Sequence, residues 1–168
     1  MKKLFFAFWP DDTIRQQCSN VLGTITGNCS PVALKNIHAT VLFLGRINVE
    51  QQAAIAEAVA TLPIPGVRLC FDRLSFWKKP GILCLTCRHF DQEVVTLSEQ
   101  LAAIAKQYAV TVDESPFKPH ITLARKAKRA VEVEFEPIIW KIQAFCLVES
   151  CSLADGIEYR VLQRWPEI

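Results

Sequence analysis

Two short stretches of this chain carry the same pair of residue types at the same spacing. His38 is followed by Thr40, and His120 is followed by Thr122. Successive side chains of a β-strand point to opposite faces, so the histidine and threonine of each motif share one face. Two such strands brought together would place two imidazoles and two hydroxyls in one space. Because an imidazole gains and loses a proton near neutral pH, the pattern predicts acid–base chemistry with hydrogen-bond donors beside it.

A structural role for these histidines is the alternative. A His-x-Thr pattern is common by chance, and a lone histidine in a strand is usually a hydrogen-bonded structural residue. Here two of the three histidines carry the pattern, each after a polar approach and before an apolar run. His89 lacks these features and is expected to be an incidental surface residue. The threonines also have a structural explanation, because threonine is common in β-strands whatever their function.

Composition limits the class of protein. A chain of 168 residues with 51% apolar content is enough for one domain with a sizeable core, or for two small lobes that share one. A net charge of +2 does not by itself indicate nucleic-acid binding. The basic residues are locally concentrated, however, and a charge run beside a candidate site favours an anionic ligand over a merely solvated face. These residues are Arg125, Lys126, Lys128 and Arg129, with Lys78 and Lys79 in a loop-like stretch.

Cysteine usage and apolar runs indicate the compartment. The number of cysteines, seven, is odd, and most of them lie in apolar segments that resemble strands. This predicts buried, reduced thiols in a cytosolic protein. The apolar start of the chain is too short for a signal peptide and lacks a cleavage site. No apolar run approaches the ~20 residues needed to cross a bilayer. We therefore expect a soluble, cytoplasmic protein without a membrane partner.

The elements that must position the two motifs follow from the hydrophobic pattern, which predicts the order β-α-β-α-β-β-α-β-β-β-β. The expected elements are a strand over 4–9, a helix that opens at 10–13 and ends at 27–28, a strand that carries the first motif and closes at Gly45, a helix over 49–62, strands over 67–71 and 82–87 around a turn at 76–81, a helix over 92–108, a strand that carries the second motif, and strands over 131–135, 140–149 and 157–165. Each half holds one motif and no linker divides the halves. The pattern predicts two α+β lobes with weak internal symmetry in one domain over 1–168.

The paired motifs resemble those of the 2H phosphoesterase superfamily, which is named for two His-x-Thr/Ser-x motifs. Within it, the chain is most similar to the bacterial and archaeal RNA 2',3'-cyclic phosphodiesterases, also called 2'-5' RNA ligases. The similarity runs nearly end to end, over residues 4–7, 36–45, 116–125 and 156–165. Around Thr40, the chain has Ala39 and Val41 where the family usually shows larger apolar residues. This departure leaves the histidine and threonine intact.

The resemblance implies a fold and an activity. The implied fold is a bilobed α+β domain in which two antiparallel sheets face each other across a central cleft, with helices outside and a pseudo-two-fold symmetry. One motif would lie on the central strand of each sheet. The implied activity is hydrolysis of 2',3'-cyclic phosphate ends of RNA or nucleotides to 2'-phosphates. His38 would donate a proton to the leaving oxygen, and His120 would accept one from water.

Residues in and near the motifs are candidates for binding the substrate. The hydroxyls of Thr40 and Thr122 would donate to the non-bridging phosphate oxygens, where charge concentrates in the transition state. Arg125 is a candidate phosphate clamp, although a regular strand would point it away from His120 unless a bulge turns it back. Five aromatic residues are candidates for stacking on nucleobases, and Phe117, next to the second motif, is the best of them. The five are Phe43, Phe76, Trp77, Phe117 and Tyr159.

No cofactor or metal is expected, because the motifs supply proton transfer and hydrogen-bond donors directly. Cys84 and Cys87 form a single CxxC inside a strand without a second pair of ligands, which argues against a zinc site there. Two other functions stay open: 2'-5' RNA ligase activity in the same cleft, and a nucleotide- or RNA-binding module without chemistry. The binding module is less favoured, since binding alone does not require a matched acid–base pair. We expect a monomer.

Overall fold

The computed structural model describes residues 1–64 and 66–167, and in this part of the chain three α-helices and ten strands form an α+β fold. The α+β class predicted from the sequence is confirmed. In chain order the elements are β1 (Lys2–Phe8), α1 (Asp12–Thr24), β2 (Ser30–Pro31), the 3₁₀ helix η1 (Leu34–Asn36), β3 (Ala39–Ile47), α2 (Val49–Val59), β4 (Val67–Phe71), β5 (Arg73–Trp77), β6 (Ile82–Thr86), α3 (Gln92–Gln107), β7 (His120–Arg125), β8 (Ile138–Ile142), β9 (Phe145–Leu153) and β10 (Gly156–Trp165).

The strands form two four-stranded sheets and one two-stranded ribbon, all antiparallel. The first sheet has the order β10-β9-β1-β3, the second has the order β2-β7-β6-β5, and the ribbon pairs β4 with β8. β7 therefore lies inside its sheet, whereas β3 is an edge strand. The expectation of a central strand for each motif is correct for the second motif and wrong for the first.

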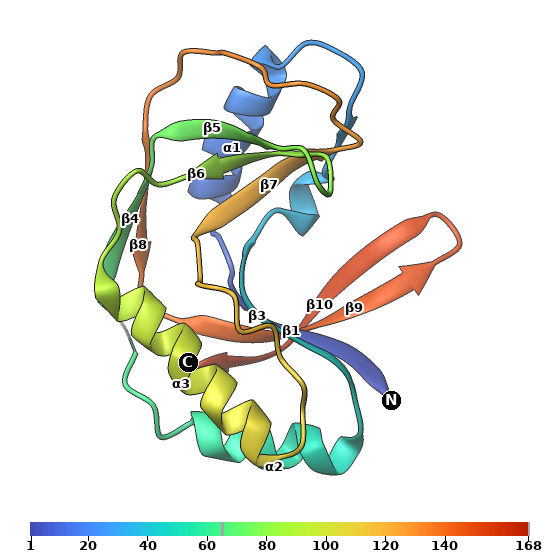
Figure 1. The fold of residues 1–168 in the computed structure, drawn as a ribbon, viewed down its shortest axis with the longest axis vertical. Helices are drawn as coiled ribbons and strands as arrows, with labels where there is room; N and C mark the ends of the chain where they lie inside the picture. The colour runs from blue at the N-terminus through green and yellow to red at the C-terminus, as the bar shows by residue number, and fades with distance from the viewer. Residues whose placement is uncertain (65, 168) are drawn as a thin grey trace.

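Helices cover the outer faces of both sheets (Figure 1). α3 packs against β3 and α2, while α1 packs against β7 and β8. Local signals define where these helices begin. The Asp11 carboxylate accepts a hydrogen bond from the Ile14 backbone N–H at 2.9 Å, and Asn48 and Gln51 form a reciprocal capping box at the start of α2. No helix in the described part of the chain is long and apolar enough to cross a membrane.

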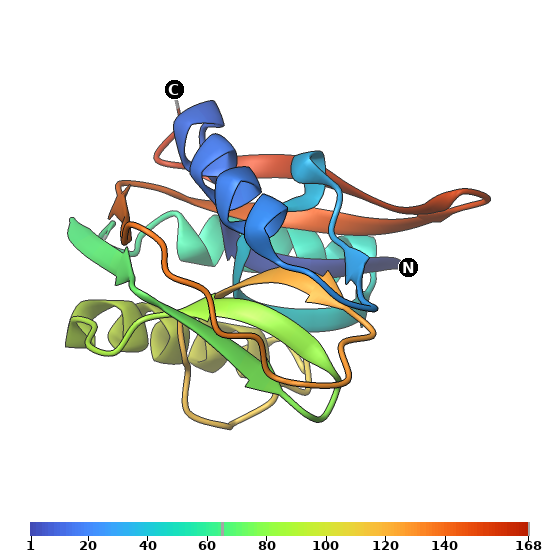
Figure 2. The ribbon, with the colours of Figure 1, turned by 90° about the horizontal axis from the view of Figure 1, so that it is seen from above.

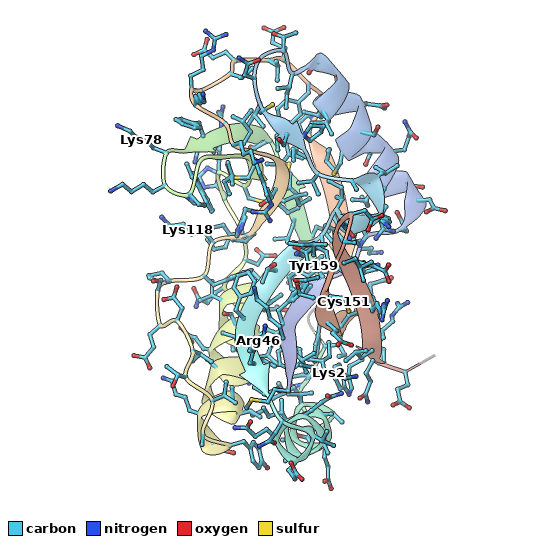
Figure 3. All side chains as sticks on the ribbon, turned by 90° about the vertical axis from the view of Figure 1, so that its right-hand side faces the viewer. Lys2, Arg46, Lys78, Lys118, Cys151 and Tyr159 are labelled. Carbon is cyan, nitrogen blue, oxygen red and sulfur yellow. The ribbon has the colours of Figure 1, made fainter. Side chains whose placement is uncertain are left out.

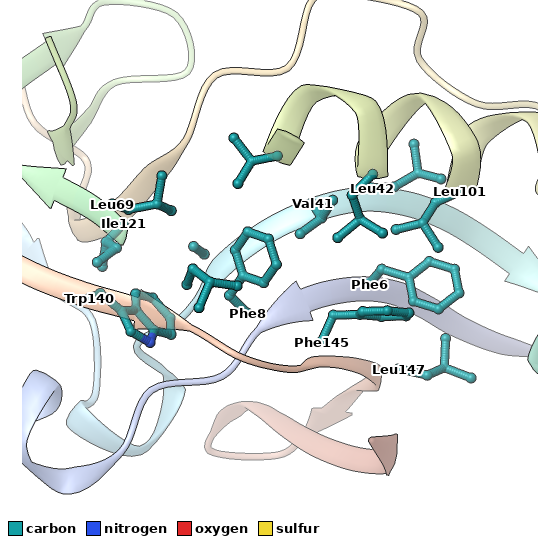
Figure 4. Packing of buried hydrophobic residues seen from close by; sticks show 14 of the residues in the cluster. Phe6, Phe8, Val41, Leu42, Leu69, Leu101, Ile121, Trp140, Phe145 and Leu147 are labelled. Carbon is teal, nitrogen blue, oxygen red and sulfur yellow. The ribbon is translucent and has the colours of Figure 1, made fainter. Parts of the chain in front are cut away.

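The main core lies between the first sheet and its helices. Large aromatic side chains fill it: Phe6 lies edge-to-face on Phe145 with 6.0 Å between ring centroids, and Phe145 stacks on Trp165 at 5.3 Å. Leu42 points from β3 toward α3, where Leu101 belongs to the same core (Figure 4). All of these side chains are buried. His38 therefore directly precedes, and Thr40 lies in, a strand that is fixed by packing along its length.

Three sequence predictions about strands are wrong. Residues 131–135 form no strand, although their burial alternates along the segment. The strand predicted over 140–149 is two strands, β8 and β9, which belong to different sheets. Residues 76 and 77, predicted as part of a turn, end the unpredicted strand β5, and the turn is limited to the residues that follow.

The cysteines are free thiols, and four of them, Cys18, Cys84, Cys87 and Cys146, are buried. Burial raises the pKa of Cys84 and of Cys87 to about 12, so both are protonated at neutral pH. Among the described residues, no three His, Cys, Asp or Glu side chains gather as a metal-binding group.

Candidate active site

His38 is held by both of its ring nitrogens. Its Nδ1 lies 2.7 Å from the backbone oxygen of Asn36, and its Nε2 lies 2.8 Å from Oγ1 of Thr40. A carbonyl oxygen only accepts, so Nδ1 carries the hydrogen and donates it. In the neutral imidazole, Nε2 is therefore the free base and accepts a hydrogen bond from the Thr40 hydroxyl.

His120 is held in the same way at the start of β7. Its Nδ1 donates to the backbone oxygen of Lys118 at 2.9 Å. In both motifs, the carbonyl two residues before the histidine thus fixes the tautomer and leaves Nε2 for chemistry. The ring of Trp77 lies against His120 with 4.6 Å between centroids.

A cleft of about 810 Å³ between the two sheets brings the motifs together. This cleft confirms the expectation of two sheets facing each other across a central space. Six of the seven predicted site residues line it: His38, Thr40, Phe43, His120, Thr122 and Arg125. Phe117 lines an adjoining cavity of 490 Å³ that also reaches Thr40, Phe43 and His120. The structure therefore places Phe117 at the side of the cleft.

A β-bulge explains how Arg125 reaches the cleft from its odd offset. β7 pairs Thr122 with Cys84 and Ala124 with Leu83, so that Leu123 is left as an extra residue. A bulge shifts the alternation of side chains by one position, and Arg125 returns to the face of Thr122.

The first motif has a bulge at the same place. β3 pairs Thr40 with Ala7 and Leu42 with Phe6, which leaves Val41 as the extra residue. Phe43 therefore stands at the same offset from His38 as Arg125 does from His120. The two strands present His, Thr and a third residue to the cleft in the same order, with an aromatic ring in one and a guanidinium in the other.

Aromatic rings surround His38 on several sides. Trp9 stacks on its imidazole at 5.7 Å and 18°, Phe5 is tilted at 5.1 Å, and Tyr159 lies edge-to-face at 5.0 Å. Tyr159 was predicted only as a candidate for nucleobase stacking, and sequence reasoning missed Phe5 and Trp9. Both follow a strand pattern that indicated burial alone, and no signal in the sequence related them to His38.

Asn36 is a second residue that sequence reasoning missed as part of the site. Its backbone carbonyl accepts from His38, and its side-chain Nδ2 donates to the backbone oxygen of Ile157 at 2.9 Å. Asn36 therefore connects the first histidine to the β9–β10 hairpin, which projects beyond the first sheet (Figure 1) and supplies Tyr159. By contrast, Phe76 packs against Leu83 on the outer face of the second sheet, so it is not available for stacking in the cleft.

The environment of the cleft disfavours protonation of both histidines. Burial is the largest cause that lowers the pKa of His38, to about 4. The basic groups of His120, Arg125 and Arg15 lower this pKa further, and the hydrogen bond to Asn36 opposes them. Burial and Arg125 also lower the pKa of His120, against the hydrogen bond to Lys118. At neutral pH the ligand-free cleft therefore holds two neutral imidazoles near a permanent cation. A bound anion would favour the protonated form of both histidines and would therefore raise their pKa values.

Known proteins resemble this chain in sequence and in structure along nearly its whole length. A family model described as the 2'-5' RNA ligase superfamily matches residues 10–153. A curated relative from Escherichia coli (strain K12), named RNA 2',3'-cyclic phosphodiesterase, is 29% identical over 98% of this chain and 96% of its own. A solved structure described as a phosphoesterase superposes with a TM-score of 0.91 at 28% identity, over 98% of this chain and 97% of the other. Escherichia coli LigT complexed with 3'-AMP superposes with a TM-score of 0.90 at 27% identity, over the same shares of the two chains.

Proposed function

The chain belongs to the 2'-5' RNA ligase superfamily, and from this premise we propose that it is an RNA 2',3'-cyclic phosphodiesterase with His38 and His120 as its acid and base. The substrate would be an RNA or nucleotide that ends in a 2',3'-cyclic phosphate. The product would carry its phosphate on the 2' oxygen and a free 3' hydroxyl. Residues 1–168 would act as one domain.

One observation carries this proposal: two imidazoles are held alike at a single cleft. Each donates Nδ1–H to the carbonyl two residues before it, so each presents Nε2 as the atom that exchanges a proton. Each has a threonine two residues later on the same wall. Opening a cyclic phosphate needs one group that takes a proton and one that gives a proton, and this pair supplies both.

In the proposed reaction, Nε2 of His120 accepts a proton from water as the water oxygen forms a bond to phosphorus. The bond between phosphorus and the 3' oxygen breaks, and Nε2 of His38 donates its proton to that oxygen. The assignment of the two roles follows the family resemblance. The pair needs no metal for either proton transfer.

His38 must be protonated to act as the acid, although its pKa in the empty cleft is about 4. The negative charge of a bound phosphodiester would raise this pKa, since it favours the imidazolium. Protonation also changes the role of Thr40: once Nε2 carries a hydrogen, it no longer accepts from the Thr40 hydroxyl, and the hydroxyl hydrogen is released. This hydrogen can then be donated to a non-bridging phosphate oxygen.

The other lining residues would bind the substrate around the phosphate. Thr122 can donate to the phosphate and Arg125 can pair with its charge. Trp77 and Tyr159 both line the cleft beside a histidine, and with Phe43 they are the rings best placed to contact a base. Phe117 would contact a part of the substrate that extends into the adjoining cavity.

The test is end-group analysis on a panel of 2',3'-cyclic phosphates with His38→Ala and His120→Ala. We expect each variant to lose at least ~10²-fold in kcat, which is the usual contribution of one acid–base group. His89→Ala is the matched control, because His89 is exposed and does not line the cleft. Wild-type turnover should persist in EDTA.

Three results would contradict the proposal. The first is release of 3'-phosphate ends, the second is activity that EDTA abolishes, and the third is full activity in either cleft variant. Tight nucleotide binding by titration without turnover of any cyclic phosphate would support a binding module instead.

Ligation is a second candidate function, favoured by the name of the family that matches the chain. If a 5' hydroxyl takes the place of water, the same two proton transfers join a cyclic end to it through a 2'-5' linkage. Comparison of forward and reverse rates on one nicked RNA separates the two activities.

We also propose that the protein acts as a monomer in the cytoplasm. One chain supplies both histidines and both threonines of the cleft, so the site needs no residue from a partner. The free thiols are consistent with a reducing compartment. Sedimentation equilibrium of the purified chain tests the monomer.

A further inference from the structure

Five exposed cations lie on two neighbouring loops at one end of the second sheet. Lys78 and Lys79 belong to the β5–β6 turn, and Lys126, Lys128 and Arg129 follow β7. We call these five residues the basic rim. Within residues 1–64 and 66–167, none of the five takes part in an ion pair. Lys78 projects outward from the turn (Figure 3). Since the whole chain has a net charge of only +2, the rim is a local concentration of positive charge.

Backbone contacts hold the two loops of the rim together. The Ala127 N–H donates to the Gly81 oxygen at 3.0 Å, and the Gly81 N–H donates to the Trp77 oxygen at 2.8 Å. Lys126 has a φ of 56°, a left-handed conformation that turns the chain toward Gly81. The loop after β7 therefore lies beside the β5–β6 turn (Figure 2). These hydrogen bonds fix the two loops relative to each other, so the five charges of the rim form one continuous surface.

The rim separates the cleft from a second cavity behind the sheet. Trp77, Pro80 and Arg125 line the cleft on one side. On the other side, Lys128 and Arg129 line a cavity of about 300 Å³ together with residues 26–29. Neighbouring residues of β6 confirm that the two spaces lie on opposite faces, because Ile82 lines the cleft and Leu83 lines the cavity. The rim thus forms a bridge over the end of the sheet between two concave spaces.

We propose that the basic rim binds the backbone phosphates of the single-stranded RNA that precedes the terminal cyclic phosphate. The strand leaves the cleft past Trp77 and Pro80, crosses the rim, and reaches the cavity lined by Lys128 and Arg129. This proposal rests on the proposed function and narrows its substrate from a nucleotide to an RNA chain.

Charge and shape favour an RNA strand as the occupant. The phosphates of an RNA strand match a cluster of lysines and an arginine that form no ion pair in the described part of the chain. Among the acidic residues of the following segment, Glu134 and Glu136 line a different cavity with Asp72, and Glu132 forms no ion pair with the rim within the described residues. The rim also begins where the cleft ends, so a strand anchored in the cleft is already beside it.

The first experiment compares two substrates with the same reacting end. kcat/KM is measured for a 2',3'-cyclic mononucleotide and for a pentaribonucleotide that ends in the same nucleotide and cyclic phosphate. We expect the pentaribonucleotide to react at least ~20-fold faster by this measure at low salt, with an advantage that decreases as salt rises. If about three phosphates contact the rim, the advantage should fall by about 20-fold between ~50 and ~200 mM salt, because each contact on a single strand contributes a slope of about −0.7.

The second experiment removes charge from the rim. The double variant Lys128→Ala/Arg129→Ala is compared with Arg68→Ala/Lys141→Ala, which removes the same two residue types from the β4–β8 ribbon, where Arg68 and Lys141 are exposed and paired across the strands. We expect the ratio of the two kcat/KM values to fall ~10-fold or more in the rim variant and to stay unchanged in the control. A ratio is used because it cancels any loss of folded enzyme.

Each possible failure has a different signature. If the wild type opens neither substrate, the proposed function fails and the rim proposal falls with it. If the mononucleotide is opened but the pentaribonucleotide has no advantage, only the rim proposal is wrong. Equal effects of the rim and control variants would show that net charge, and no local surface, attracts the RNA.

Discussion

Single residues set the charge of the cleft and hence its preference for an anion. Arg125 opposes protonation of both His38 and His120, and burial acts in the same direction on each. The empty site therefore has neutral bases and a guanidinium with no ion-pair partner among the described residues. Binding of a phosphate would pair this guanidinium and draw protons onto the histidines. Substrate binding and protonation of His38, the proposed acid, are thus thermodynamically coupled.

Arg125→Gln tests this coupling. The substitution removes a positive charge that lowers the pKa of both histidines, so we expect the pKa values of His38 and His120 to rise in an NMR titration of the free protein. We also expect kcat/KM to fall by about 10–100-fold, which corresponds to the ~1.5–3 kcal/mol typical of a hydrogen bond to a charged group. Arg46→Gln is the control, because Arg46 is exposed on β3 and does not line the cleft. A fall in activity with unchanged histidine titrations would contradict the coupling.

The residues of the motifs could be predicted from the sequence, but their immediate surroundings could not. His38 and His120 stand out because their type and spacing suit one chemistry. Trp9 and Phe5 contact His38 only because β1 pairs with β3, and such a pairing is a property of the fold. The position of Arg125 depended on one extra residue in β7, which the sequence allowed without requiring.

Among the elements, the errors of prediction lie mainly where the chain passes from one sheet to another. β4 and β5 are separated only by Asp72, yet β4 pairs with β8 and β5 pairs with β6. Likewise, β8 and β9 are separated by two residues and belong to different sheets. Hydrophobic alternation indicates that a segment is extended, but it does not indicate which strand the segment pairs with. Residues 131–135 make the same point, because they alternate in burial without pairing to any described strand.

The turn between β5 and β6 depends on a glycine. Gly81 has a φ of 85°, and a Cβ built there would lie 3.1 Å from the Ala127 oxygen. We expect Gly81→Ala to lower the free energy of unfolding by about 1–2 kcal/mol, through backbone strain and this close approach. Chemical denaturation measures the change. Since the contact joins both loops of the basic rim, the variant should also reduce the advantage of the pentaribonucleotide.

Gly23→Ala is the matched control for that substitution. Gly23 lies in α1, and a Cβ there meets nothing within 4 Å. Alanine should therefore raise the free energy of unfolding by up to ~1 kcal/mol, since it is the better helix former. Equal effects of the two substitutions would mean that the turn does not need a glycine.

At the scale of the whole molecule, the active site exists only where the two sheets meet. The first sheet contributes Phe43 and Tyr159 to the cleft, the second contributes Thr122 and Arg125, and neither sheet forms the cavity by itself. His38 is partly buried by this assembly and becomes fully solvated when the chain unfolds. Its low pKa is therefore a property of the folded protein, and it links stability to pH.

The direction of this link follows from proton uptake. Between pH 6.5 and about 4, an unfolded chain protonates His38 while the folded protein keeps it neutral, so stability decreases as pH falls through this window. The full difference is on the order of 3 kcal/mol, at about 1.36 kcal/mol for each unit of pKa. We expect His38→Asn to lose less stability than the wild type between these pH values in denaturant titrations. His89→Asn is the control and should lose as much stability as the wild type, because His89 is exposed and lies outside the cleft. Inorganic phosphate should restore part of the wild-type loss, since it favours the protonated histidines of the folded cleft. Parallel pH profiles for wild type and His38→Asn would show that the cleft does not hold His38 neutral.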